Sequence, residues 1–477
     1  MKKIISSFIA LLLLLVLVGC IQPTSNESPN GEIFDETKTW EMYGEGHLVS
    51  RPIEIDYWHA NSALDIQGKT MARMVEEFNA YQQETYPDSP ITVKLTFTNG
   101  YIPMNQKLQA GLLGNTNPEI AMVGVSSMAL YHSSAIDMRE IFTYDEIRDI
   151  FPGFLQFAMY RDKFVAYPYF AASNVMVLNR TLLNRTGMHI PTVDEIVADP
   201  ENSIWTWDYL REVIEAVRAL PDAKEKNLYG LATNGIPLYE SFFSYGEAPY
   251  DPSATKTAFK RDTAIKIFKY WQDMAKDDLF ENPVIDPQHH NQIKGKYING
   301  QYGIMIASSS MVLDMHNSLK DPETGEFSFE ADVLPHPKQK YFYSNHSGGG
   351  LILFNNKNQT RRSAAVEFLR WLQAPEQQVE FSTNAGYLIT TYSSRATQAW
   401  KDFTQNVNPT MDEVLKMMEF VPQAGLRLPI GRAKGLADDD FGKYSKGIFY
   451  ENFKRTPADV VDECMRRVNQ VLDENKE

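Results

Sequence analysis

Cysteine is scarce in this sequence: among 477 residues there are only two, Cys20 and Cys464. Two cysteines cannot build a scaffold held by several disulfides or a zinc site with four thiolate ligands. Basic residues are also outnumbered, with 46 Lys+Arg against 61 Asp+Glu and a formal net charge of −15. Because an acidic surface repels phosphate backbones, we expect no nucleic-acid partner.

Motifs that mark enzymes and nucleotide sites are missing as well. The sequence has no GxGxxG after a predicted strand, no GxxxxGK[ST], no HExxH and no GxSxG. The cluster Gly348-Gly349-Gly350 precedes an apolar strand instead of opening a helix. His289-His290 and Asp438-Asp439-Asp440 are predicted in solvated loops, because neighbouring histidines diverge and the acids lack EF-hand spacing. We therefore expect no catalytic residue, no cofactor and no metal.

A long apolar run occurs only at the N-terminus. It spans residues 4–18, follows Lys2-Lys3 and ends in Leu17-Val18-Gly19-Cys20. The run is shorter than the roughly 20 residues of a membrane-spanning helix and suits a signal peptide, predicted at 1–19. Its ending resembles a bacterial lipobox, whose cysteine thiol accepts a lipid. We expect lipidation at Cys20; an ordinary signal peptide with an incidental cysteine is the alternative.

The next segment, residues 20–47, is predicted to be the lipid anchor and a flexible tether. Its first part, 21–39, is rich in Pro, Ser, Asn, Thr and Glu and cannot bury enough apolar surface to offset the entropy of ordering. No later segment approaches 18 consecutive apolar residues. We therefore expect the remainder to be an exported, soluble body.

Predicted strands and helices alternate along this body. Alternating apolar residues or short apolar runs predict strands, and apolar residues spaced i, i+3, i+4, i+7 predict amphipathic helices. The strands are expected at 53–58, 91–97, 119–123, 175–178, 302–307, 331–335 and 351–354, and the helices at 71–78, 104–113, 207–220, 263–274, 364–372 and near the C-terminus. This order predicts an α/β fold with a parallel sheet covered on both faces. Cys464 falls among valines of the last helix and is predicted to be buried.

Aromatic residues stand beside several predicted strand ends and turns. Such rings stack on the C–H faces of sugars, while phenol and indole tips bind hydroxyls. Each one alone is more readily explained as a core residue, but as a set at the strand ends of an α/β sheet they favour a ligand cleft. The set comprises Tyr101, Tyr167, Tyr169, Trp205, Trp207 and Tyr387.

An ordered series of segments resembles family 1 extracellular solute-binding proteins, the receptors of ABC importers. The segments are "NPEIAMVG", Ala166-Tyr167-Pro168, "TWDYL", "GQYGIMIASSS", "SGGGLILF" and "AVEFLRWLQAPEQQVEFSTNAGYLITT", within about residues 50–430. The resemblance implies a two-lobed periplasmic-binding-protein type II fold, in which two α/β lobes joined by crossing strands close over a ligand. The lobes implied are 48–172 with 340–386 and 173–339 with 387–477, and the crossings lie near Ala171–Val175, Pro335–Ser344 and Asn384–Leu388.

Within this family the sequence is most similar to glycerol-3-phosphate-binding receptors. It shares "GYL" at Tyr387 and a late Gly425-Leu426-Arg427-Leu428 element. The resemblance implies ligand contacts at Tyr101, Ser308, Ser309, Gly348, Gly349, Tyr387 and Arg427. A guanidinium suits bidentate phosphate binding, so Arg427 is the informative residue, with lobe packing as its alternative role.

Two departures weaken the match to glycerol phosphate. Met122 stands where those receptors have a carboxylate, and Ala171-Ala172 replace their serine pair. A sugar stacked on Trp207 and the tyrosines is therefore at least as well supported. The sequence predicts a monomeric lipoprotein on the outer face of the cell membrane that binds a carbohydrate or a glycerophospho-compound and delivers it to an ABC permease. An exported lipid-anchored glycoside hydrolase or a surface adhesin is the alternative.

Overall fold

The computed structural model describes residues 41–281, 289–355, 358–420 and 433–475. The described residues belong to one compact unit. The predicted signal peptide, Cys20 and Arg427 lie outside the described residues.

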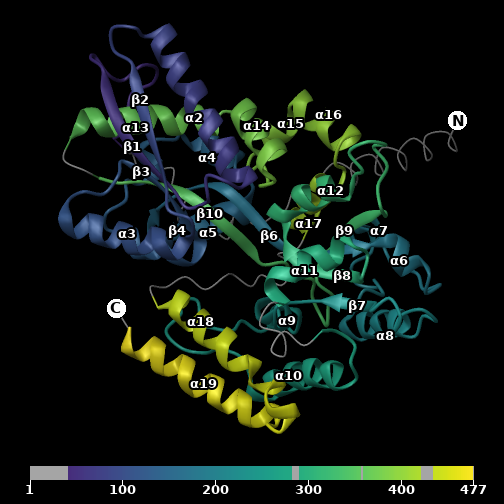
Figure 1. Ribbon diagram of the computed structural model, residues 1–477. Helices are drawn as coiled ribbons and strands as arrows, with labels where there is room; N and C mark the ends of the chain where they lie inside the picture. The colour runs from purple at the N-terminus through teal and green to yellow at the C-terminus, as the bar shows by residue number, and fades with distance from the viewer. Residues whose placement is uncertain (1–40, 282–288, 356–357, 421–432, 476–477) are drawn as a thin grey trace, which may run out of the picture. The chain divides into compact units, whose positions relative to one another are not determined.

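A mixed eight-stranded sheet forms the framework (Figure 1). The strand order is β2-β1-β3-β10-β6-β8-β7, and β9 also pairs with β6. Its strands are β1 (Ile53–His59), β2 (Ile91–Phe97), β3 (Ile120–Gly124), β6 (Tyr167–Asn179), β7 (Tyr229–Ala232), β8 (Tyr302–Ser308), β9 (Ala331–Leu334) and β10 (His346–Leu353), while β4 (Met159–Tyr160) and β5 (Lys163–Phe164) form a separate hairpin. Strand β1 is parallel to β2 and β3, and β7 is parallel to β8, whereas β10 and β6 run antiparallel to their neighbours. The expected parallel sheet is thus parallel only toward its two ends.

Helices cover the sheet, and further helices make up much of the second half of the chain. They are α2 (Ile66–Thr85), α3 (Tyr101–Gly114), α4 (Tyr144–Asp149), α5 (Pro152–Ala158), α6 (Arg180–Asn184), α7 (Val193–Ala198), α8 (Trp207–Arg218), α9 (Leu238–Ser244), α10 (Arg261–Lys276), α11 (His289–Ile298), α12 (Val312–Leu319), α13 (Gln359–Gln373), α14 (Pro375–Ala385), α15 (Tyr392–Ala396), α16 (Gln398–Asn406), α17 (Thr410–Phe420), α18 (Lys434–Ser445) and α19 (Pro457–Glu474). Among the residues described, no helix is both long enough and apolar enough to cross a membrane.

Both faces of the sheet are covered around β1, as the alternating pattern predicts. Successive residues of a strand point to opposite faces. Tyr57 packs against Phe368 of α13, with ring centroids 5.8 Å apart. The next residue, Trp58, approaches α3 so closely that its ring lies 3.4 Å from where a Cβ on Gly111 would be. Helices α13 and α3 therefore lie on opposite faces.

Strand β6 changes partners along its length. Its first part, through Ser173, pairs with β10, and its second part, from Asn174, pairs with β8 and β9. This change falls inside the stretch 171–175, where the first crossing between lobes is expected. The two-lobe boundaries themselves stay a prediction.

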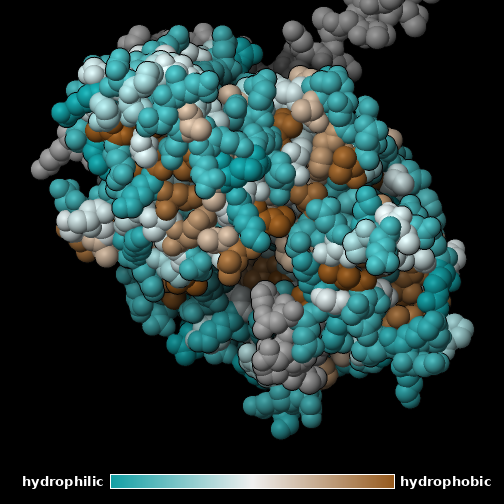
Figure 2. Space-filling model, turned by 45° about the horizontal axis from the view of Figure 1, so that its top comes forward, coloured by the Kyte–Doolittle hydropathy of each residue, from teal (hydrophilic) through white to brown (hydrophobic). Residues whose placement is uncertain are grey.

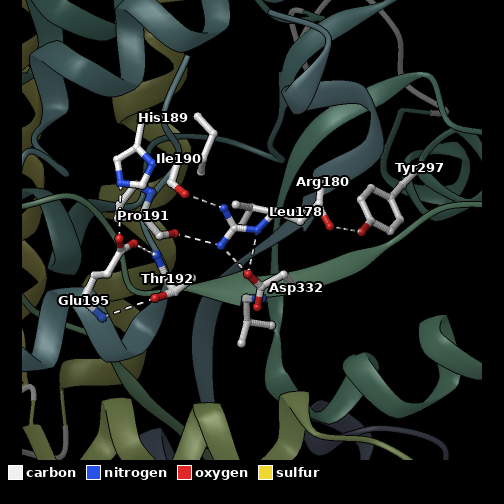
Figure 3. Close-up of polar contacts among 10 residues, drawn as sticks. Leu178, Arg180, His189, Ile190, Pro191, Thr192, Glu195, Tyr297 and Asp332 are labelled. Atoms are coloured by element: carbon white, nitrogen blue, oxygen red, sulfur yellow. Dashed lines mark hydrogen bonds and ion pairs between the residues drawn. The ribbon is translucent and has the colours of Figure 1, made fainter. Parts of the chain in front are cut away.

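The end of β6 is anchored by a buried arginine (Figure 3). Arg180 donates from Nε to Oδ2 of Asp332 at 2.6 Å. Its Nη1 and Nη2 donate to the carbonyl oxygens of Ile190 and Pro191, each at 2.7 Å. The guanidinium thereby links β6, β9 and the loop before α7, and its charge is balanced in the interior by the Asp332 carboxylate.

Two predicted loops are helical instead. His289-His290 begin α11, and Asp438-Asp439-Asp440 lie within α18. In α18, the buried residues Ala437 and Phe441 are spaced i, i+4 and face the core, so the acidic run takes the other side of a helix. The prediction for Cys464 is confirmed: it is a free, fully buried thiol in α19.

Candidate ligand-binding site

The middle of β6 gathers several of the predicted ligand contacts. Gly349 of β10 pairs with Phe170, and Gly348 pairs with Ala171. Ala171 also forms an isolated antiparallel bridge with Leu388, the residue after Tyr387. Segments more than 170 residues apart in sequence therefore meet at two adjacent positions of one strand.

The predicted serines meet β6 at its next residues. Ser309 is fully buried, and its Oγ accepts the backbone N–H of Ser173 at 3.0 Å. Ser308 ends β8 and lies opposite Asn174. Its Oγ lies 2.9 Å from the Oγ of Ser310. Ser309 thus holds the strand in place, while Ser308 is the serine that lines a cavity.

Tyr101 lies over two glycines. It opens α3, and its ring lies 3.1 Å from where a Cβ on Gly124 would be; a Cβ on Gly349 would lie 3.1 Å from its hydroxyl oxygen. Burial and the adjacent Tyr387 raise the pKa of Tyr101 well above its ordinary value, so its hydroxyl keeps its proton. Tyr387 in turn packs on Phe170, with ring centroids 5.5 Å apart. The structure therefore brings Tyr101, Gly349 and Tyr387 together.

Trp207 does not join this group. It is 5% exposed, and its ring centroid lies 6.0 Å from those of Tyr270 and Trp271. Its indole N–H donates to the hydroxyl of Ser244 at 2.9 Å. This environment favours the core-packing role for Trp207 over a stacking platform.

The two departures from the glycerol-phosphate receptors lie at the same centre. Met122 is fully buried in β3 and pairs with Leu351. This position therefore carries an apolar side chain and no carboxylate. Ala171 and Ala172 pair with Gly348 and Ser347. Arg427 lies outside the described residues, so its role stays a prediction.

A cavity of about 860 Å³ opens at the carboxyl ends of β7 and β8. Ligand sites in α/β sheets favour this position. Amide and hydroxyl groups, aliphatic side chains and charged residues line it together: Asn174, Thr233, Asn234, Gly235, Ile236, Pro237, Ile293, Lys294, Met305, Ile306, Ala307, Ser308, Met311, Asp438, Asp439, Gly442, Lys443, Ser445, Lys446 and Tyr450. Of the predicted contacts that the structure describes, Ser308 alone is among them. The face in Figure 2 is hollowed, with hydrophobic residues in the depth of the hollow.

One acidic group of the cavity, Asp438, is paired within the protein. Asp438 accepts hydrogen bonds from the Nζ of Lys434 at 2.6 Å and from the hydroxyl of Tyr239 at 2.8 Å. Burial, together with the neighbouring Asp438 and Asp440 carboxylates, raises the pKa of Asp439. Asp438 is therefore already engaged by side chains of the protein, while the Asp439 carboxyl holds its proton more readily than a free one.

Basic groups of the cavity divide into paired and unpaired ones. Lys294 forms an ion pair with Asp314. Within the part of the chain that the structure describes, Lys443 and Lys446 have no ion-pair partner, although the Nζ of Lys443 lies 5.3 Å from the centre of the Tyr444 ring. Two ammonium groups therefore remain available on α18 and just after it.

Comparison with known proteins identifies the family. The sequence model of the family described as "Bacterial extracellular solute-binding protein" matches residues 73–408, more than two thirds of the chain. The chain belongs to this family. The matched region contains Tyr101, the β6 junction, Ser308–Ser309, Gly348–Gly349 and Tyr387, whereas the cavity-lining residues within 438–450 lie beyond it.

Individual bacterial extracellular solute-binding proteins resemble the chain over most of its length. The sn-glycerol-3-phosphate-binding periplasmic protein UgpB of Pectobacterium atrosepticum is 22% identical over 449 residues, which cover 88% of this chain and 91% of the relative. UgpB of Escherichia coli K12 is also 22% identical, over 446 residues, covering 88% and 92%.

Solved structures show the same fold. The cyclic alpha-maltosyl-1,6-maltose binding protein of Arthrobacter globiformis superposes with a TM-score of 0.66 at 20% identity, covering 89% of this chain and 100% of that one. UgpB of Mycobacterium tuberculosis, in complex with glycerophosphocholine, gives a TM-score of 0.68 at 15% identity, covering 90% and 99%. The predicted α/β fold of the type II periplasmic-binding class is confirmed.

Proposed function

We propose that this solute-binding protein is the receptor of an ABC importer, which captures a carbohydrate or a glycerophospho-compound and delivers it to a membrane permease without chemical change. The observation that supports this most is the cavity at the ends of β7 and β8, next to the β6 positions where Tyr387, Gly348–Gly349 and Ser308 converge. Two similar proteins, an sn-glycerol-3-phosphate-binding periplasmic protein and a cyclic alpha-maltosyl-1,6-maltose binding protein, point the same way.

The carbohydrate variant rests on the size and lining of the cavity. About 860 Å³ is within the range of small-molecule pockets, roughly 300–1,000 Å³. Asn174, Asn234 and Ser308 provide amide and hydroxyl groups of the kind that bind sugar hydroxyls. Because Trp207 is buried, stacking would depend on Tyr450 instead, the aromatic residue among the described residues that line the cavity.

The glycerophospho variant rests on charge. Lys443 and Lys446 present ammonium groups to the cavity without an ion-pair partner in the described part of the chain. Arg427 would add a bidentate phosphate contact if it faces the same space. This variant therefore predicts a ligand with one anionic end.

Isothermal titration calorimetry tests the proposal with maltose, maltotriose, sn-glycerol-3-phosphate and glycerophosphocholine. We expect binding of at least one, with contraction of the particle in small-angle X-ray scattering as the two lobes close. For the glycerophospho variant, Arg427→Ala should abolish binding, whereas binding of a neutral sugar should be little affected. Absence of binding to every compound would contradict the proposed function.

We also propose that Cys20 carries a lipid that holds a monomer on the outer face of the cell membrane. Two features of the sequence support this: the run of residues 4–18 and its ending in Leu17-Val18-Gly19-Cys20. Labelling with a radioactive fatty acid should mark the wild type and not Cys20→Ala. Equal labelling of both proteins would contradict lipidation at this residue.

A further inference from the structure

Asn174 occupies the point where β6 passes from one set of partners to the other. Its backbone N–H donates to the carbonyl oxygen of Asn345 at 3.1 Å, and its Cα lies opposite that of Ser308. The side chain is half-buried and lines the cavity. Asn174 is therefore held by the backbone on both sides while its amide reaches the cavity wall.

Glu240 determines which end of that amide faces the cavity. The Glu240 carboxyl lies in α9, is 2% exposed, and its Oε1 accepts a hydrogen bond from Nδ2 of Asn174 at 3.0 Å. Because Oε1 is the acceptor of this hydrogen bond, the amide turns its nitrogen toward Glu240. Oδ1 is then directed away from Glu240, and it has no hydrogen-bond partner among the described residues.

The Glu240 carboxyl is itself held in place. Burial raises the pKa of Glu240, while hydrogen bonds from its own backbone N–H, from the Asn174 amide and from the backbone N–H of Asn345 oppose that rise. The same carboxyl thus ties together the start of α9, the β6 junction and the segment before β10. Glu240 can therefore orient Asn174, but Glu240 does not itself line the cavity.

An amide oxygen that faces a cavity selects for hydrogen-bond donors. A sugar or glycerol hydroxyl has a proton to donate, whereas a fully ionised phosphate oxygen has none. We propose that Asn174 is a specificity-determining residue that accepts a hydrogen bond from a hydroxyl of the ligand, and that Glu240 is the positioning residue that orients it. The inference rests on the proposed function and assigns the hydroxyl-bearing part of the ligand to the β6 side of the cavity.

Calorimetry on four variants tests the assignment, with whichever of maltose, maltotriose, sn-glycerol-3-phosphate and glycerophosphocholine the wild type binds. Asn174→Ala should weaken binding about tenfold, as expected for the loss of one hydrogen bond. Glu240→Leu should weaken it by a similar factor, because the amide is no longer oriented. Glu240→Gln should retain wild-type affinity, because its amide oxygen accepts the same hydrogen bond. The Asn174→Ala/Glu240→Leu double variant should bind no more weakly than Asn174→Ala alone.

A matched control separates binding from folding. Gln82 is also a buried polar residue; its Nε2 donates to Oε1 of Glu367 at 2.8 Å and its Oε1 accepts the backbone N–H of Ile91 at 3.2 Å, and none of these residues lines the cavity. Gln82→Leu should lower the melting temperature and leave the affinity unchanged.

Three results would overturn the inference: wild-type affinity in Glu240→Leu, additive losses in the double variant, or equal losses in Glu240→Gln and Glu240→Leu. If Glu240→Leu does not fold, the affinity of Asn174→Ala tests the inference instead. Wild-type affinity in Asn174→Ala would overturn the inference as well. A wild type that binds none of the compounds would remove the proposed function, and this inference with it.

Discussion

At the residue scale, glycine makes the junction between β10 and β6 possible. Gly348 has a φ of +95°, a backbone conformation that residues with a side chain rarely adopt. A Cβ there would lie 1.9 Å from the carbonyl oxygen of Phe170. Two effects therefore act on one position: the backbone conformation and the lack of space.

The loss of stability caused by a side chain at Gly348 can be measured. We expect Gly348→Ala to lower the free energy of unfolding by about 3–4 kcal/mol, because strain and overpacking add. Gly187 is the matched control, since its φ of +72° is also positive but a Cβ there would meet no atom within 4 Å. Gly187→Ala should cost only about 1–2 kcal/mol. Equal losses in urea denaturation would show that the close contact at Gly348 does not matter.

A single carboxyl in α17 should make stability depend on pH. Burial and the neighbouring Asp332 carboxylate raise the pKa of Glu413 from 4.5 to about 9, although Lys416 and Arg180 oppose this. Because the folded pKa is above the unfolded one, the folded state retains a proton that the unfolded state loses. This contribution is complete below pH 4.5 and declines as pH rises toward 9.

Glu413→Gln should therefore stabilise the protein more at pH 8 than at pH 5. The measurement is the free energy of unfolding from urea denaturation at both pH values. A variant that changes stability equally at the two values would show that Glu413 ionises normally in the folded protein.

At the element scale, β6 depends on the Arg180–Asp332 ion pair at its end. The two side chains are 9% and 16% exposed, so removing one partner leaves a buried charge. Arg180→Met should lower the free energy of unfolding by about 3–5 kcal/mol, the usual cost of breaking a buried pair. Adding Asp332→Leu should recover part of the loss, because no unpaired carboxylate then remains.

An exposed pair provides the comparison. Arg261 and Asp462 form an ion pair in which the side chains are 47% and 55% exposed. Arg261→Met should change the urea midpoint little, because solvent screens this pair. A loss as large as that of Arg180→Met would contradict the role of burial.

Most strands of the main sheet and six of the longer helices could be predicted from the sequence, because their periodicity reports the face that each one buries. The strand at 53–58 and the helix at 263–274 match β1 and α10 closely. The direction of β10 could not be predicted, because strand pattern carries no information on which neighbour a strand joins. The acidic run 438–440 was misassigned because three adjacent charges obscure the buried Ala437 and Phe441 on either side of them.

The candidate site was predicted less completely than the fold. The resemblance to known receptors found Tyr101, Gly349 and Tyr387, which the structure brings together. It missed Asn174 and Glu240, because a lone amide and a lone acid, 66 residues apart, carry no motif. Their relationship arises only when α9 packs beside the β6 junction.

At the scale of the whole molecule, buried histidines should make the fold sensitive to acid. Burial lowers the pKa of His59 and of His336 to about 3 and that of His346 to about 4. The unfolded chain binds these protons near pH 6.5, so their contribution is complete above that pH and is lost as pH falls toward 3–4. The effect is opposite in sign to that of Glu413.

We therefore expect the free energy of unfolding to decrease between pH 6.5 and pH 5, before most carboxylates are protonated. His336→Phe should flatten this decrease by removing one of the three proton-binding groups. Denaturant curves at half-unit pH intervals provide the measurement. A wild type whose stability is constant over this window would contradict the expectation.

The place of β10 in the sheet has a consequence for the order of folding. It lies between β3 and β6, yet residues 346–353 follow both strands by more than 160 residues in the chain. Until this segment arrives, β3 lacks its outer neighbour and the first part of β6 has no partner, so their N–H and C=O groups are open to pairing with other chains. A chain that ends before residue 346 would carry both open edges permanently and would be prone to aggregate. The sheet is therefore completed at its middle, by a strand that is among the last to be synthesised.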